Sequence, residues 1–538
     1  MIRVRSAGDA ALLLEAPATH QDGNGAAAIA ALIRSADLPG VTDVVPGAAT
    51  VLVAVDPGSW DTSALAARLT ALVDDHSLRG AADLAGRSDI EIEVCYDGPD
   101  LADVAALTVL SVADVIARHQ AAQYRVGWLG FAPGFAYLTG LDPLLATVPR
   151  LDSPRLRVPA GSVAIAGGLA AVYPATSPGG WRLLGRTAAP LWQADRDPPT
   201  LLAPGTRVRF RAVDSLPAAP SRQRREADPI AAARRAEVLQ PGPLATVQDL
   251  GRAGLAHLGV PGSGAADTAS LRLANDLVGN EADAACVEVT LGRLAMRFDC
   301  DAVVAVTGAS TPIRVSSVAG DREVSASTAF TVPAGSVVRL GAPTTGLRSY
   351  VGIAGGIGVR PVLGSRSTDC LSGLGPSPLR TGEWLPLNRR RSGPEETRAL
   401  RPRAADPAGS AAGPVELRVI AGPRDDWFTA AALGGLANGT YVVSPASNRT
   451  GLRLTGPELR RKRPGELPSE GVATGSLQVT HDGQPILLLA DHPTTGGYPV
   501  IAVVAAADIG RAAQLRPGQQ IRFRVSRGLA LPAPPSAG

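Results

Sequence analysis

The chain has 538 residues, of which 45% are hydrophobic and 19% are charged, and its formal net charge is +3. This composition is typical of a soluble globular protein, and the length predicts three or four folded units. The mild and dispersed positive charge excludes a nucleic-acid partner, and no apolar run approaches the ~18 residues that cross a bilayer, so we expect no membrane partner either.

Cysteine and histidine spacing excludes the common metal and disulfide patterns. The cysteines, at 95, 286, 300 and 370, form no CxxC pair, and the histidines form no HExxH or HxH pair. We identify no metal site, although a carboxylate-held Mg²⁺ would leave no such spacing. The first residues, MIRVRSAGDA, do not resemble a signal peptide, so we expect a cytoplasmic protein.

Short β-branched runs between Gly and Pro turns dominate the first part of the chain. The runs ATVLVAV, IEIEV and SVAIAG predict strands. Helical spacing over residues 61–74 predicts a helix, and Ser111 with Asp114 three residues later predicts the start of another. We expect a small α/β domain over residues 1–85 and a barrel over 86–213.

The second part of the chain repeats this pattern. The runs DAVVAVTG, RSYVGIAGG, VELRVIAG and QPILLLA predict strands, and residues 267–277 predict a helix. Residues 214–236 are predicted to be a linker, and 388–414 a linker or surface excursion. The remaining units are 237–387, 415–525 and a disordered tail at 526–538. The predicted fold class is mainly β with α+β elements, built of closed barrels.

Several nucleotide and hydrolase motifs are missing from the sequence. It contains no GxxxxGK[ST], no GxGxxG and no GxSxG. This excludes a P-loop, and argues against a Rossmann dinucleotide site and an α/β-hydrolase elbow.

The first candidate constellation is HQAAQYRVGWLGFAPGFAYL, which begins at His119. His119 lies near the end of a predicted helix, where it could stabilise the helix dipole or serve catalysis. Phe131 and Gly134 belong to a loop whose glycines let the backbone approach whatever it faces. The loop is either a packed core turn or the lip of a binding site.

The second constellation spans residues 158–187 and combines glycines with hydroxyls. Such sequences expose N–H and O–H donors together, as an oxyanion or phosphate requires, although hairpin turns also use glycine. The candidate binding residues here are Ser162, Ser177, Gly179, Gly180 and Trp181.

The third constellation spans residues 246–280, where polar residues flank Gly/Pro turns. Its candidate binding residues are Gln248, Asp249 and Arg252. Asp267 is the expected cap of the following helix.

The fourth constellation follows the buried-strand run ILLLA. Asp491 and His492 come directly after it, and could act as an orienting carboxylate and a general base. Upstream, Asn448 and Arg449 could grip a carboxylate or phosphate. The further candidate binding residues are Glu470, Gln478, Thr495 and Tyr498.

These blocks carry a family resemblance. Residues 1–213 resemble the B-type subunit of 5-oxoprolinase (allophanate hydrolase subunit 1, KipI-type) through RSAGDAALLLE, GFAPGFAYLTGLD, PRLRVPAGSVAIAGG and YPATSPGGWRLLGRT. Residues 237–525 resemble the C-type subunit (allophanate hydrolase subunit 2, KipA-type) through VQDLGRAGLAHLGVPGSGAADTASLRLANDLVGN, GSRST, SNRTGLRL and ADHPTTGGYP. The chain therefore resembles a natural fusion of the two subunits.

The resemblance implies cyclophilin-like barrels, preceded by the small α/β domain. It implies ATP-dependent opening of 5-oxoproline to glutamate with a separate A-type 5-oxoprolinase subunit, with ATP and Mg²⁺ as cofactors. On this basis Asp491 and His492 would be base and orienter, and His119 would contact a pocket in the B half. Asn448 and Arg449 would bind an anion, and Ser162, Gly179 and Gly180 would line the phosphate or substrate.

The sequence departs from the family pattern in two places. Ala170 and Ala171 precede the YP pair, where Thr-Gly is common, and Asp369 follows GSRST, where an aromatic residue is more usual. These departures weaken any hydroxyl role assigned before YP.

Two other functions stay open. One is a biotin-dependent carboxyltransferase component of the urea amidolyase type, which would need a separate carrier because the chain has no MKM. The other is a regulatory inhibitor of a sensor histidine kinase. The sequence also leaves open a homo-oligomer.

Overall fold

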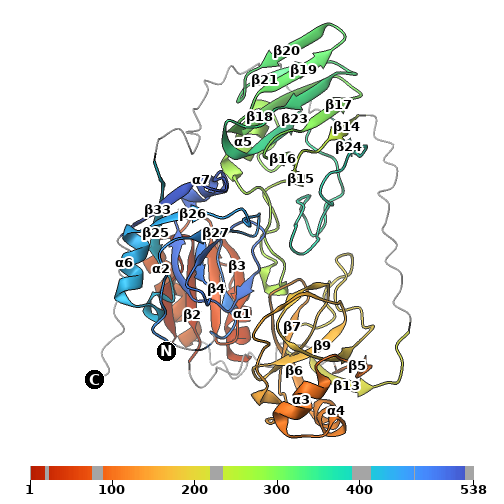
Figure 1. Cartoon of the computed structure of the whole chain (residues 1–538), viewed down its shortest axis with the longest axis vertical. Coiled ribbons are helices and arrows are strands. Elements are labelled where there is room, and N and C mark those ends of the chain that lie inside the picture. Colours follow the sequence, from red (N-terminus) through yellow and green to blue (C-terminus); the bar gives the residue numbers. More distant parts are fainter. Residues whose placement is uncertain are drawn as a thin grey trace.

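The computed structural model describes residues 2–17, 24–75, 89–217, 234–389, 413–463, 465 and 467–526 (Figure 1). Most of the two predicted linkers, and the predicted tail beyond residue 526, lie outside the described residues. The described chain is built mostly of β-sheets, one of them a closed barrel, which confirms the predicted mainly-β class.

The N-terminal unit is a four-stranded sheet with two helices. Its strand order is β1-β2-β4-β3. On α2, Leu65, Leu69 and Leu72 recur on one face and are buried against the sheet. The elements are β1 (Arg3–Ser6), β2 (Ala11–Glu15), α1 (Asn24–Ser35), β3 (Val41–Pro46), β4 (Thr50–Val55) and α2 (Thr62–Asp75).

The next unit is a seven-stranded sheet in the order β12-β9-β10-β7-β6-β13-β5. Cys95 and Arg186 form a bridge that joins its two edge strands, so the sheet closes on itself. The predicted capping box is present, since Asp114 N donates to Ser111 Oγ at 3.1 Å. The elements are β5 (Asp89–Val94), α3 (Leu101–Thr108), α4 (Val112–Ala121), β6 (Tyr124–Leu129), β7 (Ala136–Thr139), η3 (Leu145–Thr147), β8 (Arg155–Val158), β9 (Ser162–Ala166), β10 (Leu169–Val172), β11 (Ser177–Gly179), β12 (Arg182–Arg186) and β13 (Arg207–Ala212).

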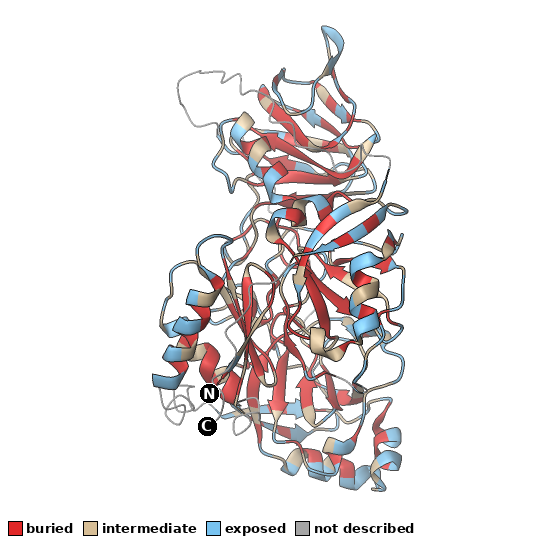
Figure 2. Cartoon of the chain, turned by 90° about the vertical axis from the view of Figure 1, so that its left-hand side faces the viewer, coloured by how far each residue is buried: buried red, intermediate tan, exposed pale blue. Residues whose placement is uncertain are grey.

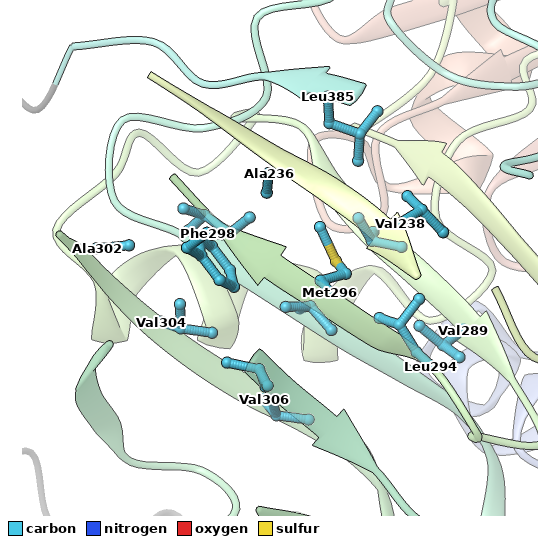
Figure 3. Close-up of a cluster of buried hydrophobic side chains, with 14 of the residues drawn as sticks. Ala236, Val238, Val289, Leu294, Met296, Phe298, Ala302, Val304, Val306 and Leu385 are labelled. Carbon is cyan, nitrogen blue, oxygen red and sulfur yellow. The ribbon is translucent and has the colours of Figure 1, made fainter. Parts of the chain in front are cut away.

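The third unit packs a six-stranded sheet against a five-stranded one. Val238, Met296 and Val304 belong to the hydrophobic core of this unit (Figure 3). Asp267 caps α5 as predicted, accepting from Ser270 N at 3.1 Å. The elements are β14 (Arg235–Gln240), β15 (Leu244–Gln248), η4 (Ala256–Leu258), α5 (Thr268–Leu277), β16 (Cys286–Thr290), β17 (Ala295–Phe298), β18 (Ala302–Ser310), β19 (Ile313–Ser317), β20 (Gly320–Val324), β21 (Ala329–Val332), β22 (Val337–Leu340), β23 (Thr345–Ile353) and β24 (Trp384–Pro386).

The last unit is a closed barrel in the order β25-β32-β29-β30-β27-β26-β33. A short two-stranded ribbon, β28-β31, stands beside it. The elements are β25 (Val415–Ala421), η5 (Asp425–Trp427), α6 (Ala430–Asn438), β26 (Thr440–Val443), β27 (Gly451–Thr455), β28 (Glu470–Gly471), β29 (Ser476–Val479), β30 (Pro485–Leu488), β31 (Thr495–Gly496), β32 (Val500–Val504), η6 (Ala506–Asp508), α7 (Ile509–Ala513) and β33 (Gln520–Val525).

The first and last units of the chain lie side by side (Figure 1). Leu13 and Leu52, on the sheet face away from the helices, pack with Ala256 and Ala473. Because side chains alternate along a strand, the N-terminal sheet has a second apolar face, and the C-terminal half covers it. The burial colouring shows buried strands through the middle of the molecule and exposed helices at its margins (Figure 2).

Within the described residues, no helix combines the length and the apolar character that a membrane crossing needs.

Candidate functional site

The loop that contains Phe131 and Gly134, which we call the aromatic-rich loop, lies where several units meet. Phe131 N donates to Thr495 Oγ1 of the C-terminal barrel unit at 2.9 Å, and Gly134 N donates to Leu258 O at 3.0 Å. A Cβ on Gly130 would stand 2.5 Å from Thr495 Oγ1, so the close approach needs glycine here. The loop is therefore an inter-unit contact of the two halves of the chain.

Tyr137 hydrogen-bonds with Ser469 and Thr495 at this contact, and we call these three residues, with the neighbouring Thr494, the seam. Burial raises the pKa of the Tyr137 phenol, against hydrogen bonds with Ser469 and Thr495 and the nearby charge of Arg150. Thr494 Oγ1 is buried without a partner among the described residues. The seam is thus a buried set of mostly hydrogen-bonded hydroxyls close to the charge of Arg150.

Rings from the same loop form a second core behind the seam. Trp128 stacks on Tyr137 with centroids 4.6 Å apart, and Phe135 meets Tyr173 edge to face. Trp181, a predicted binding residue, is buried in this cluster with only 6% exposure. The rings of this stretch therefore form a packed core turn, one of the two predicted alternatives. The backbone of the loop and the phenol of Tyr137 contact the seam.

The glycine-rich hairpin beside the aromatic cluster retains unpaired polar atoms. Ser177 Oγ and Arg155 Nη1 are buried without hydrogen-bond partners among the described residues, and β11 pairs with β8 there. A Cβ on Gly179 would lie 2.3 Å from the Tyr173 hydroxyl. Gly180 is partly exposed. Ser162 differs, since its buried hydroxyl donates to Pro159 O at 2.8 Å and is not free for a ligand.

Glu470 is buried and faces the N-terminal unit. Arg424 Nε and Nη2 donate to its Oε2 at 2.9 and 2.7 Å, while its Oε1 has no described partner. Burial raises the pKa of Glu470, and the attraction of Arg424 only partly opposes this. Arg424 also pairs with Glu15 at 2.5 Å, so Glu470 belongs to an ion-pair chain between the first and last units.

The predicted pairing of Asp491 with His492 is wrong. Asp491 is fully buried, and its two oxygens accept from Arg449 Nη2 and Nε at 2.8 and 2.9 Å. Arg449 also pairs with buried Glu288. Burial acts to raise the pKa of Asp491, but Arg449 outweighs it and holds that pKa low. The triad joins the two C-half units, and this network occupies the guanidinium predicted to bind an anion.

The side-chain hydrogen bonds of His492 go to residues outside this triad, although the charge of Asp491 acts on its ring. Its Nδ1 contacts Pro493 O at 2.7 Å, and its Nε2 contacts Thr474 Oγ1 at 3.0 Å. The carbonyl can only accept, so Nδ1 carries the proton and Nε2 accepts from the threonine. Burial lowers the pKa of His492, which favours the neutral ring. A neutral imidazole is the form a base needs, but its acceptor nitrogen is already engaged.

The pocket contact predicted for His119 is also wrong. The ring is fully buried on α4, tilted against Phe210 with centroids 4.6 Å apart and hydrogen-bonded through Nδ1 to Tyr96 at 2.8 Å. Burial lowers the pKa of His119 to about 3. It is a neutral core residue in this structure, and touches no solvent.

Other predicted residues have internal partners. Asp249 accepts from Ser365 Oγ, Ser367 Oγ and Arg366 N, and so ties the GSRST segment to β15. The side-chain nitrogens of three further predicted residues donate to carbonyl oxygens: Gln248 Nε2 to Thr368 O, Arg252 Nη2 to Ser367 O, and Gln478 Nε2 to Tyr498 O. Asn448 Oδ1 accepts from Thr450 N. These residues hold loops in shape.

A separate basic cavity of about 560 Å³ opens on the C-terminal barrel. Tyr498 borders it, since Arg461 lies 5.8 Å above the Tyr498 ring and His481 meets that ring edge to face. It is lined by Glu458, Leu459, Arg460, Arg461, Lys462, Arg463, Gly465, Thr480, His481 and Gly483.

The predicted site residues did not include the seam residues Tyr137, Ser469 and Thr494, or the basic residues 460–463. Tyr137 belongs to the sequence HQAAQYRVGWLGFAPGFAYL, but no neighbouring residue in the sequence distinguishes its phenol from an aromatic ring of the core. The basic run was visible, yet a run of charges is usually a solvated face.

No group of three or more His, Cys, Asp or Glu side chains that could hold a metal ion occurs among the described residues. The lining of the basic cavity suits anions instead, because it contains four cationic side chains and the hydroxyl of Thr480.

Comparison with known proteins places both halves. Residues 2–202 match the family described as carboxyltransferase domain, subdomain C and D, and residues 258–525 match carboxyltransferase domain, subdomain A and B. The chain is 37% identical over 290 residues to the C-type 5-oxoprolinase subunit of Escherichia coli (strain K12), covering 53% of this chain and 90% of that protein.

A second relative matches a shorter part of the chain, and a solved structure matches nearly all of it. The chain is 41% identical over 181 residues to the B-type 5-oxoprolinase subunit of Escherichia coli O157:H7, covering 33% of this chain and 80% of that protein. The crystal structure of TTHA0988 superposes with a TM-score of 0.81 at 34% identity, covering 97% of this chain and 100% of that one.

Proposed function

This chain belongs to the carboxyltransferase-domain family that includes the B-type and C-type subunits of 5-oxoprolinase, and we propose that it is the fused B–C component of an ATP-dependent 5-oxoprolinase. In this proposal it acts with a separate A-type subunit. The observation that carries the proposal is the seam, where a loop of the B-like half and a loop of the C-like half share the hydrogen bond between Phe131 and Thr495.

The chemistry sets what the site must do. A lactam resists attack because amide resonance stabilises it. Transfer of the γ-phosphoryl group of ATP to the lactam oxygen releases ADP and activates the carbon. Water then adds to that carbon, the ring C–N bond breaks, and a second water releases phosphate to give glutamate. The protein must orient two anionic groups, the γ-phosphoryl group of ATP and the carboxylate of 5-oxoproline. It must also stabilise the charge that develops in the transition state.

The seam supplies groups of the right kind for the cyclic substrate. Tyr137 and Thr495 place two hydroxyls, hydrogen-bonded to each other, close to the charge of Arg150. The unpaired Ser177 Oγ and Arg155 Nη1 on the adjoining hairpin are further donors. Neutral donors held by packing stabilise a developing oxyanion without reorganising, which is where such sites gain most of their rate.

Mg²⁺ enters this proposal as the counterion of the ATP phosphates. The described residues offer no all-protein metal cage, and Mg²⁺ commonly binds through substrate phosphates and retained waters.

The test is a coupled assay of ADP and glutamate release with 5-oxo-L-proline, run with and without a homologue of the A-type subunit. We expect release of both products in a 1:1 ratio only when ATP and that homologue are both present. Absence of 5-oxoproline-dependent ADP release in the reconstituted mixture would sink the proposal.

The family descriptions favour one second candidate, a carboxyltransferase acting on a biotin carrier. The same preparation incubated with free carboxybiotin and urea separates the two. Carboxyl transfer to urea, with no glutamate from 5-oxoproline, selects this alternative.

A further inference from the structure

The basic cavity on the C-terminal barrel has an unbalanced charge. Among the described residues, its lining contains the cations Arg460, Arg461, Lys462 and Arg463 and one carboxylate, Glu458. Lys462 is the only lysine in the whole chain. A cavity with this lining repels cations and attracts anions through its local field.

Internal ion pairs balance only part of this charge. Arg460 pairs with Glu458 at 3.2 Å and Arg463 pairs with Asp426 at 3.0 Å. Neither Arg461 nor Lys462 forms an ion pair with a carboxylate among the residues that the structure describes. Within the described part of the chain, two cations of the cavity therefore have no paired carboxylate.

Arg461 is the more constrained of the two. One of its terminal nitrogens donates to Val479 O, while its Nε is buried and has no partner among the described residues. Burial lowers the pKa of Arg461. A partly buried guanidinium with an unused donor gains from a bound anion that restores its lost solvation.

His481 lines the cavity, and the Tyr498 ring packs against two of its lining residues, Arg461 and His481. Tyr498 lies beneath Arg461, and His481 meets the same ring at 5.5 Å between centroids. Tyr498 follows Thr495 by three residues, and Thr495 is part of the seam. One loop thus borders both the cavity and the contact between the two halves.

We propose that this cavity binds a chain of phosphates, with Arg461 and Lys462 as the principal contacts. A run of cations along residues 460–463 exceeds what one phosphate group needs, and suits a linear polyanion. The identification of that chain with the phosphates of ATP rests on the proposed function, whereas the binding of a phosphate chain does not.

Calorimetric titration of the full chain at low ionic strength tests this. The probes are tripolyphosphate, ATP without Mg²⁺, orthophosphate and a short polyglutamate. We expect tripolyphosphate and ATP to bind with affinities that fall steeply with salt, and orthophosphate to bind at least about tenfold more weakly.

The double variant Arg461→Gln/Lys462→Gln should weaken tripolyphosphate binding by at least about tenfold, since it removes two charge-assisted contacts. The matched control is Arg524→Gln, which removes an exposed cation on β33 of the same barrel. Its affinity should stay within twofold of the wild type, and equal melting temperatures show that each variant is folded.

Three results overturn the inference: no binding of tripolyphosphate by the wild type, equal affinity in the double variant, or polyglutamate binding as tightly as tripolyphosphate. Because the titration contains neither 5-oxoproline nor a second protein, this outcome is independent of the 5-oxoprolinase assay. Tighter binding of ATP than of tripolyphosphate identifies a nucleotide site, and equal binding identifies recognition of the phosphates alone; both support the inference.

Discussion

The backbone N–H of Phe131 and the hydroxyl of Thr495 form a 2.9 Å hydrogen bond across 364 positions of the chain. Phe131 holds a left-handed conformation at φ 64°, which is uncommon for a residue with a side chain. The loop tolerates that conformation because Thr495 satisfies its N–H and Gly130 makes room for the threonine. The two halves therefore shape each other's loops.

Thr495→Val tests this contact directly. The change keeps the shape of the side chain but removes the acceptor, so the N–H of Phe131 loses its partner, and we expect a destabilisation of about 1–3 kcal/mol. Urea unfolding measures it. Thr495→Ser keeps the acceptor and should be closer to the wild type, and Thr455→Val, on an exposed position of β27, is the matched control. If Thr495→Val and the wild type have equal free energies of unfolding, this hydrogen bond does not stabilise the fold.

Tyr137→Phe tests the seam as the site of chemistry. Loss of one preorganised donor should lower kcat of the reconstituted 5-oxoprolinase reaction by at least about tenfold, with a smaller change in KM. The control is Tyr441→Phe, a buried tyrosine whose hydroxyl reaches only carbonyl oxygens at 3.5 Å. A Tyr137→Phe protein with unchanged kcat places the chemistry elsewhere.

Local features of the fold could be predicted because their causes are local. The capping box of Ser111 with Asp114 and the cap at Asp267 each join residues three positions apart. The packing of the first sheet on the last barrel could not be predicted in this way, because its contacts join distant positions, as from Asp9 to Ala506.

The site was harder to predict for the same reason. Asp491 and Arg449 stood out as polar residues beside a buried strand, which is a fair signal of importance. Their neutralising partner Glu288 lies 161 positions before Arg449, and no local pattern reveals that pairing. The sequence therefore pointed to these residues, but it predicted a catalytic role for Asp491 and anion binding for Arg449, whereas the two belong to a buried ion-pair network.

Asp491→Asn distinguishes these roles. Removing one charge leaves Arg449 poorly compensated in a buried site, so we expect a loss of about 3–5 kcal/mol in unfolding free energy. Arg449→Met should be similarly costly, because it removes the cation from buried Asp491 and leaves Glu288 with Arg348 at 3.6 Å. A variant that is as stable as the wild type but inactive would support a catalytic carboxylate instead.

The same network predicts an acid dependence. Burial acts to raise the pKa values of Glu288 and Asp491, but the attraction of Arg449, joined at Glu288 by that of Arg348, and hydrogen bonds outweigh it, and both pKa values lie below their ordinary values when folded. The unfolded chain then binds more protons on acidification, so this stability is present above about pH 4 and is lost as the pH falls further. In urea unfolding at about pH 7, 4 and 3, Asp491→Asn should lose less stability on acidification than the wild type.

His119→Gln predicts a different pH window. The folded pKa of about 3 lies below the unfolded value of about 6.5, so the unfolded chain binds the extra proton first. The wild type should lose about 2 kcal/mol between pH 7 and pH 5 from this residue, and the variant should not. Glutamine retains a polar partner for Tyr96. Equal acid sensitivity of the two proteins, or loss of activity at pH 7, would contradict a core role.

The contact between the first and last units predicts that the two halves stay together without the intervening chain. Co-expressed 1–217 and 234–538 should elute as one complex in gel filtration, because Glu15 pairs with Arg424 and Asp9 accepts from Ala506 N at 3.0 Å. Gly471→Ala should weaken that complex, since a Cβ there would lie 2.6 Å from Leu52 Cβ. Gly434→Ala is the matched control, because its Cβ meets open space on α6. Separate elution of the unmutated halves would show that the linkage, rather than the packing, holds them together.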